Sequence, residues 1–204
     1  MRTRPRGLDS LPGVRHAHRA LSRACTLLLS VIAIAGTGDA LHAQSRQRIS
    51  VQGSGQFVAA TKDYGTTLPK NANLGFEGQL RLTANRFSIG AGYQRSTVFR
   101  STAAGVTGTL SLAFVEPRYV VVLLGESAAL YAAGRVGYGR LMIRSTPRVS
   151  QNSTTYGGGL GVLVGLTPRV AVDIGGQYFV ADFGGGGGSA GYVLARLGLA
   201  VGLF

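Results

Sequence analysis

Apolar side chains recur at every second position along eight separate segments of this chain, and this alternation constrains the fold more than any other feature. A period of two is that of a β-strand, because successive side chains point to opposite faces of a sheet. After residue 46 no segment shows the period of an amphipathic helix. The alternating segments are 49–59, 74–84, 87–94, 110–120, 130–138, 155–166, 170–180 and 192–203. The sequence therefore predicts an all-β domain of eight strands.

The connections between these segments alternate in length. Short links occur at 85–86, 124–127 and 167–169, whereas longer links rich in Gly, Ser, Thr and basic residues occur at 61–72, 95–107, 143–154 and 182–190. An even number of antiparallel strands, with short turns at one end and long loops at the other, is typical of an up-and-down transmembrane β-barrel. Several segments exceed the roughly 9–11 residues that cross a membrane, so we expect them to project beyond it on the loop side.

The first 43 residues have the composition of a cleaved signal peptide. Arginines precede a short apolar run at 24–36, and small residues follow it at Ala40 and Ala43. This order of basic, apolar and small residues is typical of a secretory leader. We expect cleavage after Ala43, with Ala40 as the alternative, which leaves the barrel domain at 44–204.

Removal of this leader would change the chemistry available to the chain. The protein has 21 basic and eight acidic residues, a net charge of +13, and no Trp; six of the arginines, all three histidines and the single cysteine, Cys25, lie within the leader. Without an imidazole, Ser-His-acid hydrolysis is excluded, and so are metal sites built on His or Cys. We expect no catalytic residue, no metal and no cofactor. Carboxylate pairs among Glu77, Glu116 and Asp173 are the remaining catalytic option.

The two faces of the strands differ in a way that separates two kinds of barrel. One face carries Leu, Val, Ile, Phe and Tyr, and the other carries Gly, Ala, Ser, Thr and Gln with occasional charge. A membrane barrel turns its apolar face outward to lipid, whereas a soluble ligand-binding barrel turns it inward. The few acidic residues make a thin polar coat for a soluble barrel, so we favour the membrane barrel. The charges expected inside it, paired as a structural network, are Glu77, Arg81, Glu116, Arg118, Arg135, Asp173 and Arg196.

Residues 114–120 conflict with a simple alternation. Their sequence is FVEPRYV, in which Glu116 and Arg118 share the parity of Leu110, Leu112 and Phe114. If the apolar side chains face lipid and the charges face the interior, the strand needs a one-residue bulge. We expect that bulge near Val115, beside Pro117, because proline occurs in sheets mainly at edges and bulges.

Six further basic residues fall in or beside the longer connections. They are Lys62, Lys70, Arg95, Arg100, Arg144 and Arg148. On the outer side of a membrane they would face the phosphates of lipopolysaccharide, which Lys and Arg bind well; the alternative is solubilising charge without a partner. The basic residues are spread along the chain and not gathered into a stripe with stacking aromatics, which argues against nucleic acid.

Taken together, residues 46–204 resemble the small eight-stranded outer-membrane β-barrel proteins of the Gram-negative cell envelope, the OmpA/OmpX-like group. The likeness rests on the leader, the strand number, the loop asymmetry and the C-terminal Phe204. It implies a monomer in outer-membrane lipid, without cofactor, inserted by the barrel-assembly machinery that recognises the terminal aromatic residue. Gly202 and Ala200, which share the parity of Phe204, are smaller than that signal prefers.

The group includes structural anchors, adhesins, stress-resistance proteins and a few enzymes that modify lipid A, and a fold does not choose among them. We expect a non-enzymatic anchor or surface-interaction protein that acts through four extracellular loops. The alternatives are a narrow passive channel, favoured by the inward glycines Gly157, Gly159, Gly161 and Gly165, and a soluble periplasmic barrel that binds an apolar ligand. A lipid A-modifying enzyme comes last.

Overall fold

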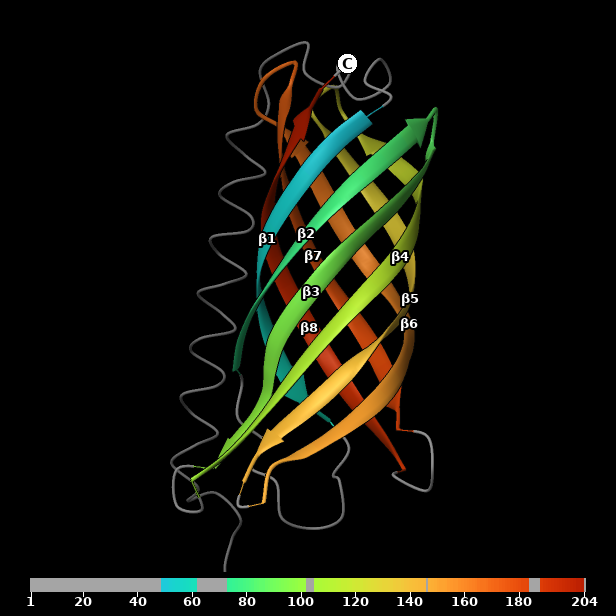
Figure 1. The fold of residues 1–204 in the computed structure, drawn as a ribbon. Coiled ribbons are helices and arrows are strands. Elements are labelled where there is room, and N and C mark those ends of the chain that lie inside the picture. The colour runs from blue at the N-terminus through green and yellow to red at the C-terminus, as the bar shows by residue number, and fades with distance from the viewer. Residues whose placement is uncertain (1–48, 62–72, 102–104, 146, 184–187, 204) are drawn as a thin grey trace, which may run out of the picture.

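The computed structural model describes residues 49–61, 73–101, 105–145, 147–183 and 188–203, and these form one closed antiparallel barrel (Figure 1). Each strand pairs with its neighbours in the sequence, and β1 pairs with β8 to close the barrel. The strands are β1 Ile49–Ala60, β2 Asn73–Ala84, β3 Phe87–Ser101, β4 Val106–Leu124, β5 Ala128–Arg144, β6 Val149–Gly165, β7 Val170–Asp182 and β8 Ser189–Gly202. The predicted up-and-down barrel of eight strands is confirmed. No helix among the described residues is long and apolar enough to cross a membrane.

The turns at one end of the barrel are short. Asn85 and Arg86 join β2 to β3, and Asn85 has φ 54°, a left-handed conformation that Asn tolerates better than most residues. Gly125, with φ 73°, begins the turn between β4 and β5. These turns lie at the positions that the sequence predicted, and we call this the turn end.

Two of the predicted long connections are wrong in extent. Residues 95–107 were expected to be a loop, but β3 continues to Ser101 and β4 begins at Val106. Likewise β5 continues to Arg144 and β6 begins at Val149, so little of 143–154 is loop. Ser, Thr and Arg on one face suggested a loop, yet the other face keeps inward apolar residues that hold these segments in the sheet. The opposite end of the barrel, where β3 to β6 extend furthest, is the loop end.

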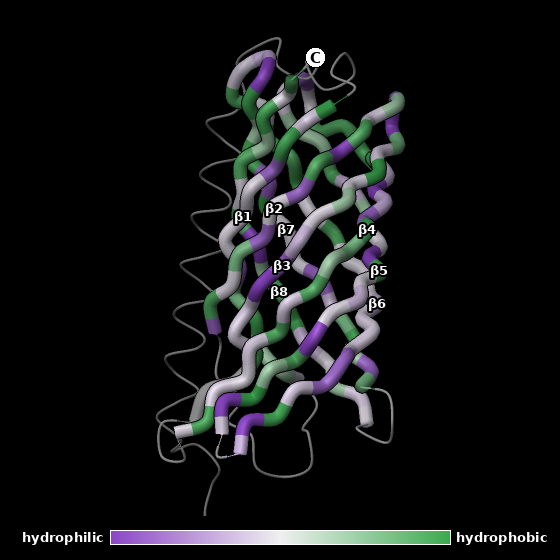
Figure 2. The backbone as a smooth tube through the Cα atoms, in the orientation of Figure 1, coloured by the Kyte–Doolittle hydropathy of each residue, from purple (hydrophilic) through white to green (hydrophobic). Residues whose placement is uncertain are grey.

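The middle of the barrel is apolar outside and polar inside. Exposed outward residues include Leu80, Val115, Val136 and Leu197, whereas Gln52 and the other inward polar side chains are buried. Figure 2 shows the resulting alternation of hydropathy along the strands. Outward aromatic residues flank this band, as in membrane barrels. They are Phe57, Phe76, Tyr93, Tyr138, Tyr156 and Tyr178 towards the loop end, and Phe87 and Tyr119 towards the turn end.

At the loop end the interior itself is apolar. A buried cluster, which we call the apolar plug, fills the barrel there; it comprises Val58, Val98, Leu110, Leu112, Phe114, Leu141, Phe179, Ala181, Phe183, Ala190, Tyr192 and Leu194. Over the same stretch of β4 the outward residues are Thr107, Thr109 and Ser111. At the loop end β4 therefore has the inside-apolar pattern of a soluble barrel, whereas the middle of the barrel has the inside-polar pattern of a membrane barrel.

This inversion removes the need for the bulge expected near Val115, and that prediction is wrong. Leu110, Leu112 and Phe114 are buried inside together with Glu116 and Arg118. The register of β4 with both neighbours stays constant across Val115, and the shifts occur instead between Thr97 and Phe99 and between Val120 and Val122. One parity serves the whole segment because the interior of the barrel changes from apolar to charged along its length.

Candidate functional site

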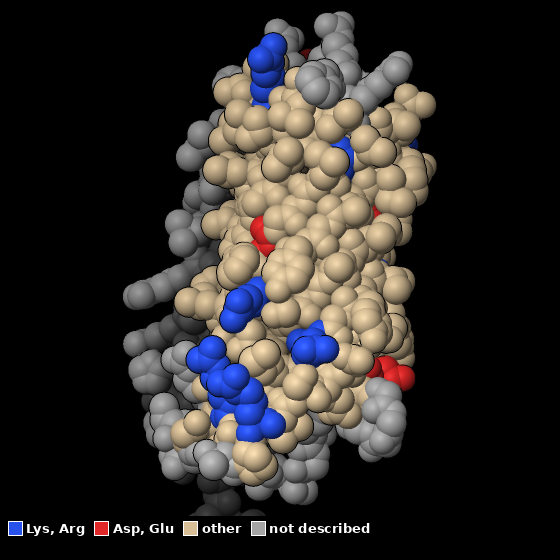
Figure 3. All heavy atoms as spheres, in the orientation of Figure 1, with Lys and Arg blue, Asp and Glu red and all other residues tan. Residues whose placement is uncertain are grey.

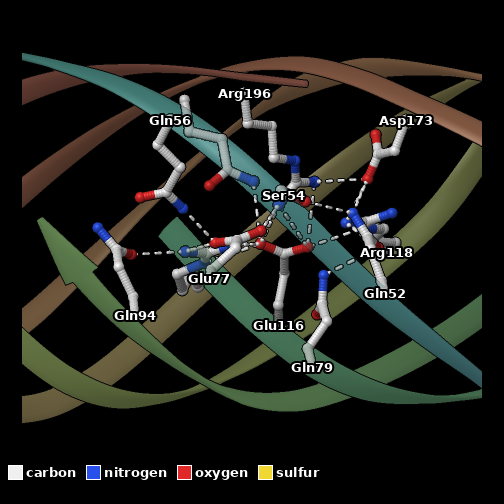
Figure 4. Close-up of polar contacts among 12 residues, drawn as sticks. Gln52, Ser54, Gln56, Glu77, Gln79, Gln94, Glu116, Arg118, Asp173 and Arg196 are labelled. Carbon is white, nitrogen blue, oxygen red and sulfur yellow. Dashed lines mark hydrogen bonds and ion pairs between the residues drawn. The ribbon is translucent and has the colours of Figure 1, made fainter. Parts of the chain in front are cut away.

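Seven charged residues from five strands meet at the centre of the barrel, and we call them the ion network. They are Glu77 and Arg81 on β2, Glu116 and Arg118 on β4, Arg135 on β5, Asp173 on β7 and Arg196 on β8. Figure 4 shows the network with the glutamines around it. All seven residues that the sequence placed in the interior are thus buried and in contact with one another through ion pairs.

Glu116 is the centre of the ion network. Its side chain has no exposed surface and contacts all four arginines. Arg118 Nε lies 2.7 Å from Glu116 Oε1, Arg81 Nη2 lies 2.9 Å from the same oxygen, and Arg196 Nη1 lies 3.0 Å from Oε2. Arg135 also donates to Oε2. A carboxylate buried this deeply depends on such partners to stay charged.

Glu77 and Asp173 extend the network to either side of Glu116. Glu77 Oε2 accepts from Arg135 Nη1 at 2.8 Å, and its Oε1 accepts from Arg196 Nη1 at 3.1 Å. Asp173 Oδ2 lies 2.9 Å from Arg118 Nη2 and 3.5 Å from Arg196 Nη2. Three of the arginines therefore each contact more than one carboxylate, and the charges are cross-linked between strands far apart in the sequence.

Neutral side chains that were not among the predicted site residues add further hydrogen bonds to the ion network. Gln52 donates to Asp173, Gln56 donates to Glu77, and Gln177 donates to Glu116. The Tyr131 hydroxyl donates to Asp173 and accepts from Arg196, while Arg118 lies 4.5 Å from the centre of its ring. Gln177 and Tyr131 share the parity of Asp173 and Arg135 on their own strands, whereas Gln52 and Gln56 lie on the polar face of β1, which carries no charge.

The inward glycines make room for large side chains and not for a channel. A methyl group at Gly161 would collide with the ring and hydroxyl of Tyr131, and one at Gly157 would meet the ring of Phe179 2.7 Å away. One at Gly159 would lie 2.8 Å from Gln177 Cγ. The space beside these three glycines is filled by residues from neighbouring strands, whereas Gly165, the fourth, lines a cavity at the turn end.

A cavity of about 500 Å³ occupies the barrel at the turn end, and we call it the turn-end cavity. Arg81, Arg118 and Tyr131, which belong to or contact the ion network, line it, and the turn residues Arg86 and Arg169 also contribute. Small residues on its walls include Ser50, Ser88, Ala129, Gly165, Ala171, Ala200 and Gly202. This cavity was not predicted from the sequence, in which its small inward residues near the turns are spread over several strands.

On the outer surface, exposed arginines gather towards the loop end, where Figure 3 shows Lys and Arg on one face. Arg95 on β3 pairs with Ser111 on β4, which pairs in turn with Arg140 on β5. Arg144 and Arg148 are exposed further towards the loops. Of the six predicted loop residues, Arg95, Arg100 and Arg144 therefore lie on strands, and only Arg148 lies in a described connection. Lys62 and Lys70 are outside the described residues, as are the side chain of Arg100, the leader and Phe204.

The fold was compared with known proteins. No protein-family model matches the chain, and no curated protein matches its sequence. Neisserial surface protein A aligns over 76% of this chain and 97% of its own, with a TM-score of 0.63 and 16% identity. Ail, the attachment invasion locus protein of Yersinia pestis, aligns over 76% and 97%, with a TM-score of 0.52 and 18% identity. The N-terminal β-barrel domain of OprF from Pseudomonas aeruginosa aligns over 77% and 98%, with a TM-score of 0.52 and 12% identity.

At these identities the comparisons concern the fold. All three structures are barrels of outer-membrane proteins, and each is covered almost completely by this chain. The closed eight-stranded topology, the apolar outer band and these likenesses agree. The chain has the fold of the small eight-stranded outer-membrane β-barrel proteins.

Proposed function

We propose that this protein is a non-enzymatic barrel of the outer membrane that anchors a projecting, lipopolysaccharide-binding end at the cell surface. The observation that carries the proposal is the inversion of the barrel along its axis. The outer face at the middle of the barrel exposes Leu80, Val136 and Leu197, which match lipid, whereas β4 from Val106 to Leu112 has its apolar residues inside and Thr and Ser outside. The outer surface of the barrel is thus suited to lipid around its middle and to water along β4 at the loop end.

Aromatic residues support a membrane boundary on the loop side. Tyr93 and Tyr138 are exposed on β3 and β5, and on each strand the next outward residue towards the loops is an arginine, Arg95 or Arg140. Tyrosine favours the interface between hydrocarbon and head groups, where its ring is in an apolar region and its hydroxyl is hydrated. The arginines then lie at the level of the lipid phosphates.

Arg95 and Arg140 are placed to share one anionic group. Both pair with Ser111, so their backbones are two strand spacings apart, about 10 Å. Two long guanidinium side chains that flank a small hydroxyl residue can converge on a phosphate, which they bind through charge-assisted, bidentate hydrogen bonds. Ail, a barrel of the same fold, has been solved with the heparin analogue sucrose octasulfate, which supports binding of a polyanion by such a barrel.

The two other expected functions fit the structure less well. A passive channel needs a continuous opening, but the apolar plug and the ion network occupy the interior of the described barrel from the loop end to its centre. A soluble barrel needs a hydrated exterior, but the outer band carries large exposed apolar residues on every strand. The ion network pairs the three carboxylates Glu77, Glu116 and Asp173 with arginines, which favours a structural role over acid–base catalysis.

Export and assembly form part of the proposal. Residues 1–43 would direct the chain out of the cytoplasm and be removed, Phe204 would be recognised by the barrel-assembly machinery, and the barrel would be a monomer. The test is membrane fractionation combined with a gel of unboiled and boiled samples. Outer-membrane recovery with a heat-dependent change in mobility supports the proposal, and N-terminal sequencing of that protein locates the cleavage site. Recovery from the soluble periplasm with no change in mobility would contradict it.

A further inference from the structure

The turn-end cavity differs from the rest of the interior because nothing in the described barrel fills it. At the loop end the inward positions carry Leu, Phe and Tyr, which pack together as the apolar plug. At the turn end they carry Ser50, Ala171 and Ala200, which are too small to meet across the barrel. The result is a cavity of about 500 Å³, within the usual size range of small-molecule sites. Because the apolar plug closes the loop end, the cavity is reached from the turn end.

The charge at the bottom of the cavity is not balanced. Among the described interior residues, four arginines face three carboxylates, which leaves one positive charge in excess. Arg81 is the least neutralised of the four. It contacts a single carboxylate, Glu116, whereas each of the other three contacts at least two.

The remaining contacts of Arg81 are with neutral groups. Its Nη1 donates to Ser88 Oγ at 3.0 Å and its Nη2 to Gln79 Oε1 at 2.8 Å. Its Nε has no hydrogen-bond partner within the described part of the chain, although the residue is only 6% exposed. The one carboxylate that Arg81 contacts, Glu116, is shared with three other arginines, so a further anion would stabilise the buried charge of Arg81.

The walls above this charge are mainly apolar. Val120, Leu163, Val170 and the alanines line the cavity between the arginines and the turns, while Arg86 and Arg169 lie at its mouth. A site with an apolar wall and a few convergent polar groups holds a ligand that has an apolar body and one polar end.

We propose that the turn-end cavity binds a small single-chain amphiphile whose carboxylate or phosphate head group contacts Arg81 and Arg118. Ser88 and Ser50 offer hydroxyl groups to the same head group, and the alkyl chain lies against Val120 and Leu163. Arg86 and Arg169 outnumber the one acidic residue that lines the cavity, Glu126, so the turn residues carry a net positive charge that attracts the anion. This proposal rests on the membrane barrel proposed above in one respect only: in such a barrel the amphiphile would enter the cavity from the periplasmic side.

The test uses the folded protein in a non-ionic maltoside detergent. Hexanoate and hexyl phosphate serve as probes, with hexanol and inorganic phosphate as comparisons, and NMR follows the Arg81 Nε–Hε resonance. Both anionic probes should give saturable shifts, with affinity at least tenfold higher than that of hexanol or inorganic phosphate. Arg81→Gln should weaken binding at least tenfold.

Two further variants separate loss of the site from loss of the fold. Ala200→Leu keeps every charge and fills the cavity, so it should also weaken binding at least tenfold. Arg148→Gln removes a positive charge at the opposite end of the barrel and should leave binding unchanged; each variant is first shown to be folded by its unboiled mobility. Because Arg81→Gln lacks the Arg81 resonance, binding to this variant is followed through the signals of other residues that line the cavity, such as Tyr131.

Absence of saturable shifts, or unchanged affinity in both Arg81→Gln and Ala200→Leu, would overturn the proposal. If hexanol bound as tightly as the anionic probes, the cavity would be an apolar site that does not recognise an anion. If inorganic phosphate bound as tightly as the anionic probes, the cavity would be an anion site that does not recognise an alkyl chain. Either result would contradict the binding of an amphiphile. Binding in detergent does not depend on cellular location, so this failure is distinct from failure of the fractionation experiment.

Discussion

The guanidinium carbon of Arg135 lies 3.9 Å from the centre of the Phe114 ring, at the junction between the ion network and the apolar plug. The same guanidinium carbon is 5.3 Å from the ring of Phe179. Its nitrogens donate to Glu77 and Glu116 on the other side. The cation–π contact stabilises the Arg135 guanidinium on the side of the apolar plug, because the face of an aromatic ring attracts a cation although the ring is uncharged. The carboxylates stabilise it on the side of the ion network. Arg135 therefore joins the polar half of the interior to the apolar half.

The central position of Glu116 predicts a large loss of stability in Glu116→Gln. This change leaves four buried arginines with two carboxylates, and removal of one partner of a buried ion pair typically costs about 3–5 kcal/mol. Urea unfolding of the folded protein, followed by loss of unboiled mobility, measures the change. The control is Glu126→Gln, which removes the same charge from an exposed turn and should change stability little. Equal stability of the two variants would show that the ion network does not hold the barrel together.

The packing of Tyr131 against Gly161 predicts that Gly161→Val destabilises the barrel. The added side chain would displace the Tyr131 ring and break its hydrogen bond to Asp173, at a cost of about 1–3 kcal/mol for overpacking. Gly176→Val is the matched control, because its added methyl groups would enter open space on the outer surface. The temperature at which each variant loses its unboiled mobility gives the comparison. A barrel that tolerates both changes equally would mean that Tyr131 does not fill the space beside Gly161.

The filled interior predicts that the protein does not conduct ions. In planar bilayers we expect no resolved single-channel openings, because the apolar plug excludes water at the loop end and the ion network fills the centre. Discrete openings of constant conductance in the unmodified protein would contradict a closed interior and would favour a passive channel.

The outward arginines predict that their replacement selectively weakens the binding of lipopolysaccharide. The double variant Arg95→Gln and Arg140→Gln should bind lipopolysaccharide about tenfold more weakly, because each charge-assisted hydrogen bond is worth about 1.5 kcal/mol and exposure to water reduces this. The control is Arg86→Gln with Arg169→Gln, which removes two charges at the turn end. Binding to lipopolysaccharide in mixed detergent micelles, measured at two salt concentrations, provides the comparison. An equal loss in the two double variants would point to net charge and not to a site.

The sequence predicted the eight strands, the closed barrel and the interior position of the seven charged residues, because all of these depend on alternation within one strand. It could not predict which charges pair. Glu116 meets Arg196 only because five strands converge at one level, and that depends on the register around the closed barrel. The bulge expected near Val115 was wrong for a different reason. A bulge is needed only if the inward face of β4 is polar throughout, whereas Leu112 and Glu116 are both buried, in an apolar and a charged half of one interior.

The turn-end cavity could not be predicted from any single strand either. Small residues such as Ala171 and Ala200 are common on inward faces, and they leave a cavity only where they meet other small residues across the barrel. The extent of β3 and β4 was missed because polar residues such as Arg95 and Thr107 suggested a loop, although they lie on the outer face of strands that continue beyond the apolar band.

Site-specific labelling along the outer face of β4 tests this inversion most directly. The only cysteine is Cys25 in the predicted leader, so single cysteines can be placed in the barrel without a competing thiol. Thr107→Cys, Thr109→Cys, Val115→Cys and Tyr119→Cys are exposed in turn to a membrane-impermeant maleimide on intact cells. The account predicts labelling at 107 and 109 and none at 115 and 119. Equal labelling at all four positions would indicate a barrel surrounded by water, and protection at all four would place the loop end, with its apolar plug, within the membrane or out of reach of the cell exterior.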